Sequence, residues 1–260
     1  MSYTKKPKMI LFDVGGTLFD DGKCDPVKGF EALRIKAENK EITTAERLAS
    51  RWDEFLIETE DIKSKSGVTL DVPLSAVIKY ATMQEGLKIN LPVIEQEEIF
   101  DRYNSTRTVI AGVPELLKTL KELNIRTAVI SNNMMSGESL ALALKRWIPT
   151  SDFEFVLTSA DILFAKPYKS IFECAVNFAR LKPEECWYCG DGLVPDVDGA
   201  QNSLMTPVLL DVKSQIQFEY RTEGGRCEYL TVNYWKELAE YIKKLSEWVE
   251  THSDFFNSYI

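Results

Sequence analysis

Four short segments of the chain carry the polar side chains that could do chemistry. Asp13 follows a run of apolar residues and precedes a Gly-Gly pair, and Ser131 ends a second apolar run. Lys166 stands directly before a proline, and Asp191 and Asp196 lie five residues apart after a Cys-Gly pair. Carboxylate oxygens are ligands that Mg²⁺ prefers. A lysine, a hydroxyl and a bound cation together could hold and neutralise a phosphoryl group.

The scarcity of histidine argues against several other kinds of catalytic or metal site. The chain has a single histidine, His252, near its C-terminus. This argues against catalytic triads, histidine-rich zinc sites and histidine general bases. The five cysteines are an odd number and are interpreted as reduced thiols. Cys186 and Cys189 form a C-x-x-C pair on an expected strand, where positions i and i+3 face opposite sides, so we interpret them as buried thiols.

The composition is that of a soluble globular protein. The 260 residues include 31 Lys and Arg against 40 Asp and Glu, which gives a formal charge of −9. This acidic balance argues against nucleic acid or an anionic membrane as the main partner. No apolar run approaches the roughly 18 residues that a membrane span needs. The basic N-terminus lacks the apolar segment of a signal peptide, so a cytoplasmic location is expected.

These candidate residues need elements that bring them together, and the sequence outside residues 19–108 predicts such elements. Runs typical of strands are Lys8–Asp13, Arg126–Ser131, Phe153–Leu157, Cys186–Gly190 and Thr206–Leu210. Helical patterns between and after them are Val113–Leu123, Ser139–Arg146, Ser170–Ala179 and Trp235–Trp248. This alternation predicts an α/β fold, a parallel sheet with helices on both faces. In such sheets ligands bind at the carboxyl ends of the strands, where the candidate residues stand.

Residues 19–108 carry helical rather than strand patterns. Four helical blocks are predicted there: Glu31–Asn39, Thr43–Glu60, Pro73–Glu85 and Val93–Tyr103. The segment is close to a small domain in size. We therefore expect residues 1–18 and 109–260 to form the core and residues 19–108 to form an inserted helical domain.

The four segments, in this order, resemble the four motifs of the haloacid dehalogenase superfamily. The matching patterns are Asp13-Val-Gly-Gly-Thr-Leu, the strand-end Ser131, Lys166-Pro and Gly-Asp191 followed by Asp196-Val-Asp-Gly-Ala. Gly112-Val-Pro-Glu-Leu-Leu before the second motif strengthens the match, and the resemblance covers roughly residues 8 to 245. It implies a Rossmann-like core, with the inserted helices as a cap of the C1 type.

The resemblance also implies roles for individual residues. Asp13 would be the nucleophile that forms an aspartyl-phosphate, while Ser131 and Lys166 would hold the phosphoryl group. Further contacts to substrate would come from Gly16, Thr17 and Asn132. Mg²⁺ would be bound by Asp13, the Gly15 carbonyl and Asp191, with Asp196 in support. The leading expectation is a Mg²⁺-dependent phosphatase of a small phosphorylated metabolite.

One position departs from the phosphatase pattern. Phosphatases of this superfamily usually carry a second aspartate two residues after the nucleophile, which protonates the leaving group and then activates water. This chain has Gly15 there. General acid–base assistance is typically worth roughly 10²–10⁴-fold in rate. Asp20 and Asp21 are interpreted as turn or hinge residues, although either could replace the missing acid.

This departure keeps other functions open. Dehalogenases and phosphonate hydrolases of the superfamily also lack the second aspartate. The former typically use no metal, and the latter use a cap lysine where this chain offers arginines. A third alternative is a catalytically weak protein that binds a phosphorylated ligand or a partner. Lys169 remains a rival to Lys166 for the third motif.

Overall fold

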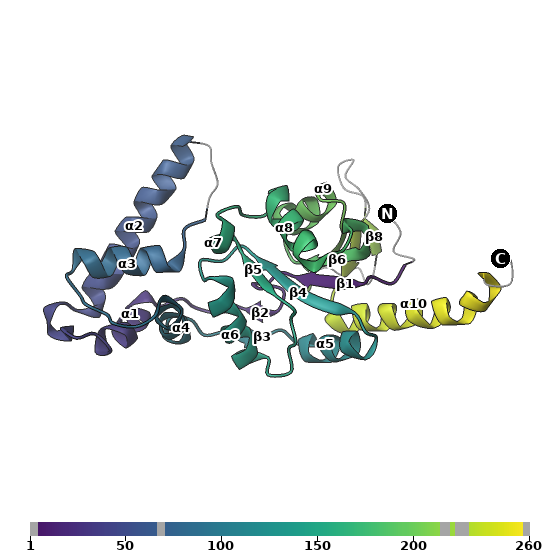
Figure 1. Cartoon of the computed structure of the whole chain (residues 1–260), viewed down its shortest axis with the longest axis horizontal. Helices are drawn as coiled ribbons and strands as arrows, with labels where there is room; N and C mark the ends of the chain where they lie inside the picture. The colour runs from purple at the N-terminus through teal and green to yellow at the C-terminus, as the bar shows by residue number, and fades with distance from the viewer. Residues whose placement is uncertain (1–4, 67–70, 214–218, 222–228, 257–260) are drawn as a thin grey trace.

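The protein is built around one seven-stranded sheet (Figure 1). The computed structural model describes residues 5–66, 71–213, 219–221 and 229–256. The strands are β1 (Met9–Phe12), β4 (Arg126–Ser131), β5 (Val156–Thr158), β6 (Cys186–Gly190), β7 (Thr206–Leu210), β8 (Glu219–Arg221) and β9 (Tyr229–Val232). Their order is β5-β4-β1-β6-β7-β9-β8. Six strands run parallel and only β8 is antiparallel, at one edge, which confirms the predicted α/β fold.

Helices cover both faces of this sheet, as the sequence predicted (Figure 1). They are α5 (Val113–Glu122), α6 (Gly137–Trp147), α7 (Ser159–Ile162), α8 (Lys169–Ala179), α9 (Gly199–Asn202) and α10 (Trp235–Phe256). Phe12 of β1 packs into a cluster with residues of α5, α6 and α10. The neighbouring Leu11 packs on the opposite face with residues of α8 and α9. No helix in the described ranges is long and apolar enough to cross a lipid bilayer.

The thiols of the C-x-x-C pair lie where the strand periodicity placed them. Cys186 belongs to the cluster under α8, and Cys189 to the cluster on the other face of the sheet. Both are buried and free, and Cys24 and Cys174 are free and exposed. The interpretation as buried strand thiols is confirmed for the pair, while Cys227 lies outside the described residues.

Four helices are inserted between two very short strands, β2 (Phe19–Asp20) and β3 (Thr108–Val109), which pair antiparallel. These helices are α1 (Pro26–Ile35), α2 (Ala45–Ser66), α3 (Leu74–Gln84) and α4 (Val93–Asn104). Trp52 of α2 stacks on Phe100 of α4 with ring centroids 5.0 Å apart. Helix α4 also contacts α6, where the buried Glu97 accepts a hydrogen bond from the Ser136 hydroxyl at 2.6 Å. The inserted helices therefore pack on one another and on the sheet domain.

Some boundaries differ from the predicted ones. Helix α1 begins at Pro26 and ends at Ile35, whereas the sequence predicted a helix over 31–39. Its start is fixed by Asp25, whose side chain accepts a hydrogen bond from Lys28 N. Proline is favourable in the first turn of a helix because the N–H groups of that turn have no partner within the helix, so the N–H that proline lacks costs no hydrogen bond.

Other elements are longer or shorter than predicted. Helix α2 continues past Glu60 to Ser66, supported by an ion pair between Asp61 and Lys65 one turn apart. Helix α10 continues to Phe256, so most of the C-terminal tail is helical. Strand β5 spans Val156–Thr158 in place of 153–157. The sequence did not predict β2, β3, β8 and β9, each of at most four residues.

The topology brings the candidate residues to one place. Strand β1 lies between β4 and β6, with Met9 opposite both Arg126 and Cys186. Strands β4 and β5 lie on one side of β1, and β6 and β7 lie on the other. Open α/β sheets bind ligands at such a switch point, at the carboxyl ends of the strands. Asp13 follows β1, Ser131 ends β4 and Asp191 follows β6.

Candidate active site

Three carboxylates meet at the carboxyl ends of β1 and β6. Oxygen atoms of Asp13, Asp191 and Asp196 lie within 4.8 Å of one another. The backbone of Asp13 is fixed because its N–H donates to the Cys189 carbonyl at 2.9 Å, which continues the β1–β6 pairing. Asp196 lies in a π-helical turn, Leu193–Asp198, directly before α9. The structure thus groups the carboxylates predicted from the first and fourth motifs.

Lys166 places one positive charge among these carboxylates. Its Nζ lies 2.7 Å from Asp13 Oδ1 and 2.6 Å from Asp196 Oδ1. The side chain is only 2% exposed, whereas that of the rival Lys169 is 55% exposed and pairs with Glu173. Burial by itself would lower the pKa of Lys166, but the two carboxylates raise it above its ordinary value. Lys166 is therefore a buried ammonium group, and it is the lysine that reaches Asp13.

Two further residues hold Lys166 in position. Asn132 accepts a hydrogen bond from Lys166 N at 2.6 Å and donates one to the Lys166 carbonyl at 3.0 Å. The Tyr188 hydroxyl accepts from Lys166 Nζ and donates to the Ile130 carbonyl, both at 2.8 Å. Both amide atoms of Asn132 bind the backbone of Lys166, and its predicted contact with substrate stays a prediction. Tyr188 was not predicted, because a tyrosine on a buried strand gives no sign that its hydroxyl points to a lysine.

The charges at this site do not balance. Burial and the charge of Asp196 raise the pKa of Asp13 to about 6, against the opposing effect of Lys166. Burial and Asp196 also raise the pKa of Asp191 above its ordinary value. Three carboxylates and one ammonium leave two negative charges when all four groups are ionised. A divalent cation with oxygen ligands fits this donor set, and Mg²⁺ has that preference.

Asp196 differs from the other two carboxylates in its contacts. Its Oδ1 accepts from Lys166 Nζ and its Oδ2 accepts from Gly192 N at 2.8 Å. Both oxygens are thus used within the protein, which favours a part in holding Lys166. The predicted supporting contact of Asp196 with a metal stays a prediction.

The turn after β1 fits closely against Asp191. Gly16 has a φ of +67°, and a Cβ placed there would lie 2.1 Å from Asp191 Oδ2. The hydroxyl of the next residue, Thr17, is buried and has no hydrogen-bond partner among the described residues. Its position beside Asp191 opposes the rise in the pKa of that carboxyl. Ser131 is also buried, at the end of β4. Gly16 is therefore needed for space, and the predicted substrate contacts of these three residues remain predictions.

We expect Gly16→Ala to disturb the site beyond the cost of its backbone conformation. A residue with a side chain at such a φ costs about 1–3 kcal/mol of folding free energy. Gly86→Ala is a matched control, since Gly86 has a φ of +69° and its nearest neighbour would be 3.6 Å away. Both variants should lose stability in urea unfolding, but only Gly16→Ala should weaken Mg²⁺ binding measured by calorimetry. Equal Mg²⁺ affinity in the two variants would contradict this geometry.

The two aspartates after the first motif have different surroundings. Asp20 Oδ1 accepts from Gly22 N at 3.3 Å, in agreement with a turn role. Asp21 Oδ1 instead lies 3.1 Å from Arg107 Nε. The arginines of the inserted helices are also paired, since Arg47 and Arg51 both contact the buried Glu85.

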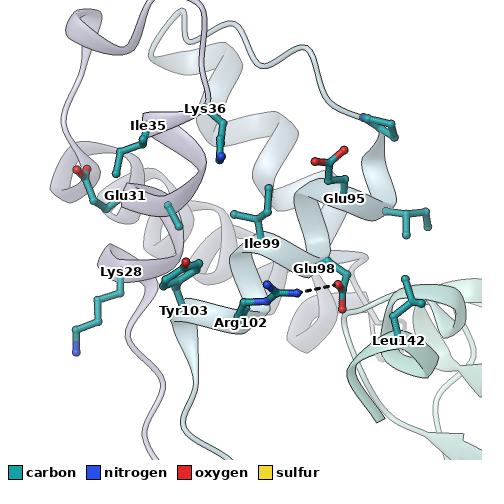
Figure 2. A pocket seen from close by; sticks show the side chains of 13 residues that line it. Lys28, Glu31, Ile35, Lys36, Glu95, Glu98, Ile99, Arg102, Tyr103 and Leu142 are labelled. Atoms are coloured by element: carbon teal, nitrogen blue, oxygen red, sulfur yellow. Dashed lines mark hydrogen bonds and ion pairs between the residues drawn. The ribbon is translucent and has the colours of Figure 1, made fainter. Parts of the chain in front are cut away.

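Two cavities border the site. One, of about 290 Å³, lies between the inserted helices and the sheet domain, and its lining includes Asp21, Trp52, Phe100, Asn132 and Met135. A second, of about 570 Å³, is lined by residues that include Gly16 and Asp191. Figure 2 shows a larger cavity, of about 920 Å³, between α1 and α4, whose lining includes none of the predicted site residues.

Comparisons with known proteins show the family of the chain. A family model for haloacid dehalogenase-like hydrolases matches residues 7–203, which include every predicted site residue. A glyceraldehyde 3-phosphate phosphatase from Methanocaldococcus jannaschii is 24% identical over 251 residues, which are 92% of this chain and 99% of that protein.

Solved structures share the fold. A 2-haloacid dehalogenase from Pseudomonas syringae aligns with a TM-score of 0.58 and 20% identity, over 92% of this chain and 99% of that one. A phosphatase of the same superfamily from Thermococcus onnurineus aligns with a TM-score of 0.53 and 18% identity, over 90% and 96%. Because a dehalogenase and a phosphatase share this fold, the fold alone does not show which of the two reactions the protein catalyses.

Proposed function

The chain belongs to the haloacid dehalogenase-like hydrolases, and from this we propose that it is a Mg²⁺-dependent phosphatase of a small phosphorylated metabolite. Asp13 is the proposed nucleophile, and Ser131 and Lys166 are the residues proposed to hold the phosphoryl group. Relatives named as phosphatases support this choice. The observation that carries it is the group of three carboxylates around one lysine.

The charge of this group separates the proposal from a dehalogenase reaction. A reaction that needs only a nucleophilic carboxylate would gain nothing from Asp191, and the charge of Asp196 helps to raise the pKa of the nucleophile Asp13. A divalent cation would offset the two negative charges that remain after Lys166 neutralises one carboxylate. When bound, Mg²⁺ would be held by Asp13, the Gly15 carbonyl and Asp191, and it supplies positive charge to phosphoryl oxygens.

The residues of the chain act as follows in the proposed reaction. Asp13 attacks phosphorus, and the bond between phosphorus and the leaving oxygen breaks. Lys166, fixed by Asn132 and Tyr188, neutralises charge on the phosphoryl oxygens, and the Ser131 hydroxyl donates a hydrogen bond to them. Water then attacks the phosphorus of the aspartyl-phosphate and releases Asp13.

Residues 19–108 are proposed to act as a cap on this site. Trp52 and Phe100 of the inserted helices line the cavity that Asn132 and Met135 border from the sheet domain. A leaving group bound there would lie between the two parts of the chain. The cavity is about 290 Å³, which suits a compact metabolite.

The first experiment is a screen of phosphate esters with and without Mg²⁺. It should include an activated aryl phosphate, glyceraldehyde 3-phosphate and simple sugar phosphates, with a 2-haloacid as the dehalogenase control. The proposal expects Mg²⁺-dependent phosphate release and no halide. Halide release without metal would support the dehalogenase, and tight binding of a phosphorylated compound without turnover would support the weakly catalytic binding protein.

We expect Asp191→Asn to weaken Mg²⁺ binding and phosphatase activity together, because a hard cation prefers charged oxygen ligands. Asp198→Asn, in the same segment, serves as the control. Calorimetry gives the Mg²⁺ affinity, and turnover measured across Mg²⁺ concentrations should show partial recovery of Asp191→Asn at high metal. Unchanged Mg²⁺ affinity in this variant would mean that Asp191 is not a ligand.

A further inference from the structure

We infer that Asp21 is the catalytic acid and base of this site, in place of the carboxylate that the chain lacks at position 15. The inference rests on the proposed phosphatase function and deepens it. It assigns proton transfer to a residue that lies outside the four motifs.

The first support is the position of the Asp21 carboxylate. A Cβ placed on Gly15 would lie 2.4 Å from Asp21 Oδ2. Standard bond lengths put the carboxylate oxygens of an aspartate about 2.4 Å from its own Cβ. An oxygen of Asp21 therefore lies as close to the Cβ position of residue 15 as the oxygens of an aspartate there would lie. Gly15 is two residues from Asp13, so this oxygen borders the nucleophile's own turn.

The second support is that the carboxylate is held in this position. Arg107 Nε lies 3.1 Å from Asp21 Oδ1, and Arg107 Nη1 lies 2.5 Å from Asp101 Oδ1. Arg107 is only 12% exposed and Asp101 only 4%, so the guanidinium has little freedom. The next residue, Gly22, has a φ of +58° and packs so closely on Thr106 that a Cβ would lie 2.0 Å from its carbonyl oxygen. Asp21 Oδ2 is left on the side of Gly15.

The third support is access. The Asp21 side chain is 57% exposed, so water and a substrate can reach it. It lines the cavity between cap and core together with Asn132 and Asn133, which directly follow Ser131. The inference requires that a phosphate ester held at Asp13 and Ser131 direct its leaving oxygen toward this cavity. Asp20 lines the other cavity, beside Gly16 and Asp191. Its carboxylate accepts a hydrogen bond from Gly22 N within the turn.

The proton balance of the two steps is simple. In the first step Asp13 forms a bond to phosphorus, the ester P–O bond breaks, and the leaving oxygen takes a proton from the Asp21 carboxylic acid. In the second step the Asp21 carboxylate takes a proton from water while the water oxygen bonds to phosphorus and the bond to Asp13 breaks. The alcohol and phosphate leave, and both aspartates return to their starting forms.

Asp21→Asn, with Asp20→Asn as the matched control, tests the inference. We expect Asp21→Asn to slow turnover of an alkyl phosphate by roughly 10²–10⁴-fold, the range of general acid–base assistance. An activated aryl phosphate needs no proton on its leaving group, so the first step should survive and phosphorylated Asp13 should accumulate in quenched samples. Asp20→Asn should behave like the wild-type protein in both assays.

A double variant guards against a merely structural effect. Gly15→Asp combined with Asp21→Gly moves the carboxylate to position 15 and should recover part of the alkyl phosphate turnover that Asp21→Gly alone loses. Gly15→Asp alone places its carboxylate in the space that Asp21 occupies, and it should not raise alkyl phosphate turnover. Alkyl phosphate turnover by Asp21→Asn close to that of the wild type would overturn the inference. No turnover of any phosphate ester by the wild type would instead refute the phosphatase proposal itself, and the inference with it.

Discussion

Asp13→Asn is expected to abolish phosphatase turnover, by roughly 10⁴-fold or more, because a carboxamide cannot take the place of the nucleophilic carboxylate. The substitution is nearly isosteric, so the loss should occur without a loss of fold. Steady-state turnover of an activated aryl phosphate at saturating Mg²⁺ measures it. Residual turnover within tenfold of the wild type would mean that Asp13 is not the nucleophile.

The stability of this variant provides an independent check. Burial and Asp196 raise the pKa of Asp13 from its ordinary value to about 6, so the folded protein binds the proton more tightly than the unfolded chain does. Ionisation of Asp13 therefore costs stability as the pH rises from about 4 through about 6. Without divalent metal, the stability of the wild type relative to Asp13→Asn should fall over that range. An activity loss caused by unfolding would instead lower the stability of the variant at every pH.

Lys166→Met is expected to produce the second large effect, a loss of both turnover and stability. Removing one group that stabilises developing charge typically costs about 10²–10³-fold in turnover. Removing one partner of a buried ion pair costs about 3–5 kcal/mol of folding free energy, because the remaining charges stay buried without compensation. Asp13 and Asp196 would be those charges, since Lys166 lies between them.

The matched control for this variant is Lys169→Met, whose lysine pairs with Glu173 at the surface. That variant should keep nearly full activity and stability. Mg²⁺ should raise the unfolding temperature of Lys166→Met more than that of the wild type, because three carboxylates then face the cation without a competing ammonium. A mild Lys166→Met combined with an inactive Lys169→Met would place the third motif three residues later.

The parts of this site that follow from strand ends were accessible from the sequence. A buried run that stops at a polar residue, as at Asp13 and Ser131, marks both the strand and the edge at which ligands bind. Parallel pairing then brings such ends together whatever their separation in the chain. Lys166 could be expected there as well, although only its burial distinguishes it from Lys169.

The supporting residues could not be predicted, because their roles depend on where side chains meet in space. Asn132 follows the strand-end serine, and nothing in its type shows that both amide atoms bind the backbone of a lysine 34 residues later. Tyr188 would be an ordinary core residue if its hydroxyl did not reach Lys166. Asp21 and Arg107 are 86 residues apart and meet only because β2 pairs with β3.

The same limitation applies to the fold. Long amphipathic helices and buried strands give clear periodic patterns, and these were predicted in the correct order. Strands of two residues, such as β2 (Phe19–Asp20) and β3 (Thr108–Val109), are too short to show a period. It is the short pair β2 and β3 that joins the inserted helices to the sheet domain and sets the position of Asp21.

Trapping of the phosphorylated protein is the most direct test of the proposed phosphatase. The wild-type chain is mixed with an activated aryl phosphate and Mg²⁺, quenched in acid within one turnover, and digested for mass spectrometry. We expect one phosphoryl group on the peptide that contains Asp13, at its side chain, and none in Asp13→Asn or without Mg²⁺. Release of phosphate within that turnover with no phosphorylated Asp13 at any quench time would contradict the proposed mechanism.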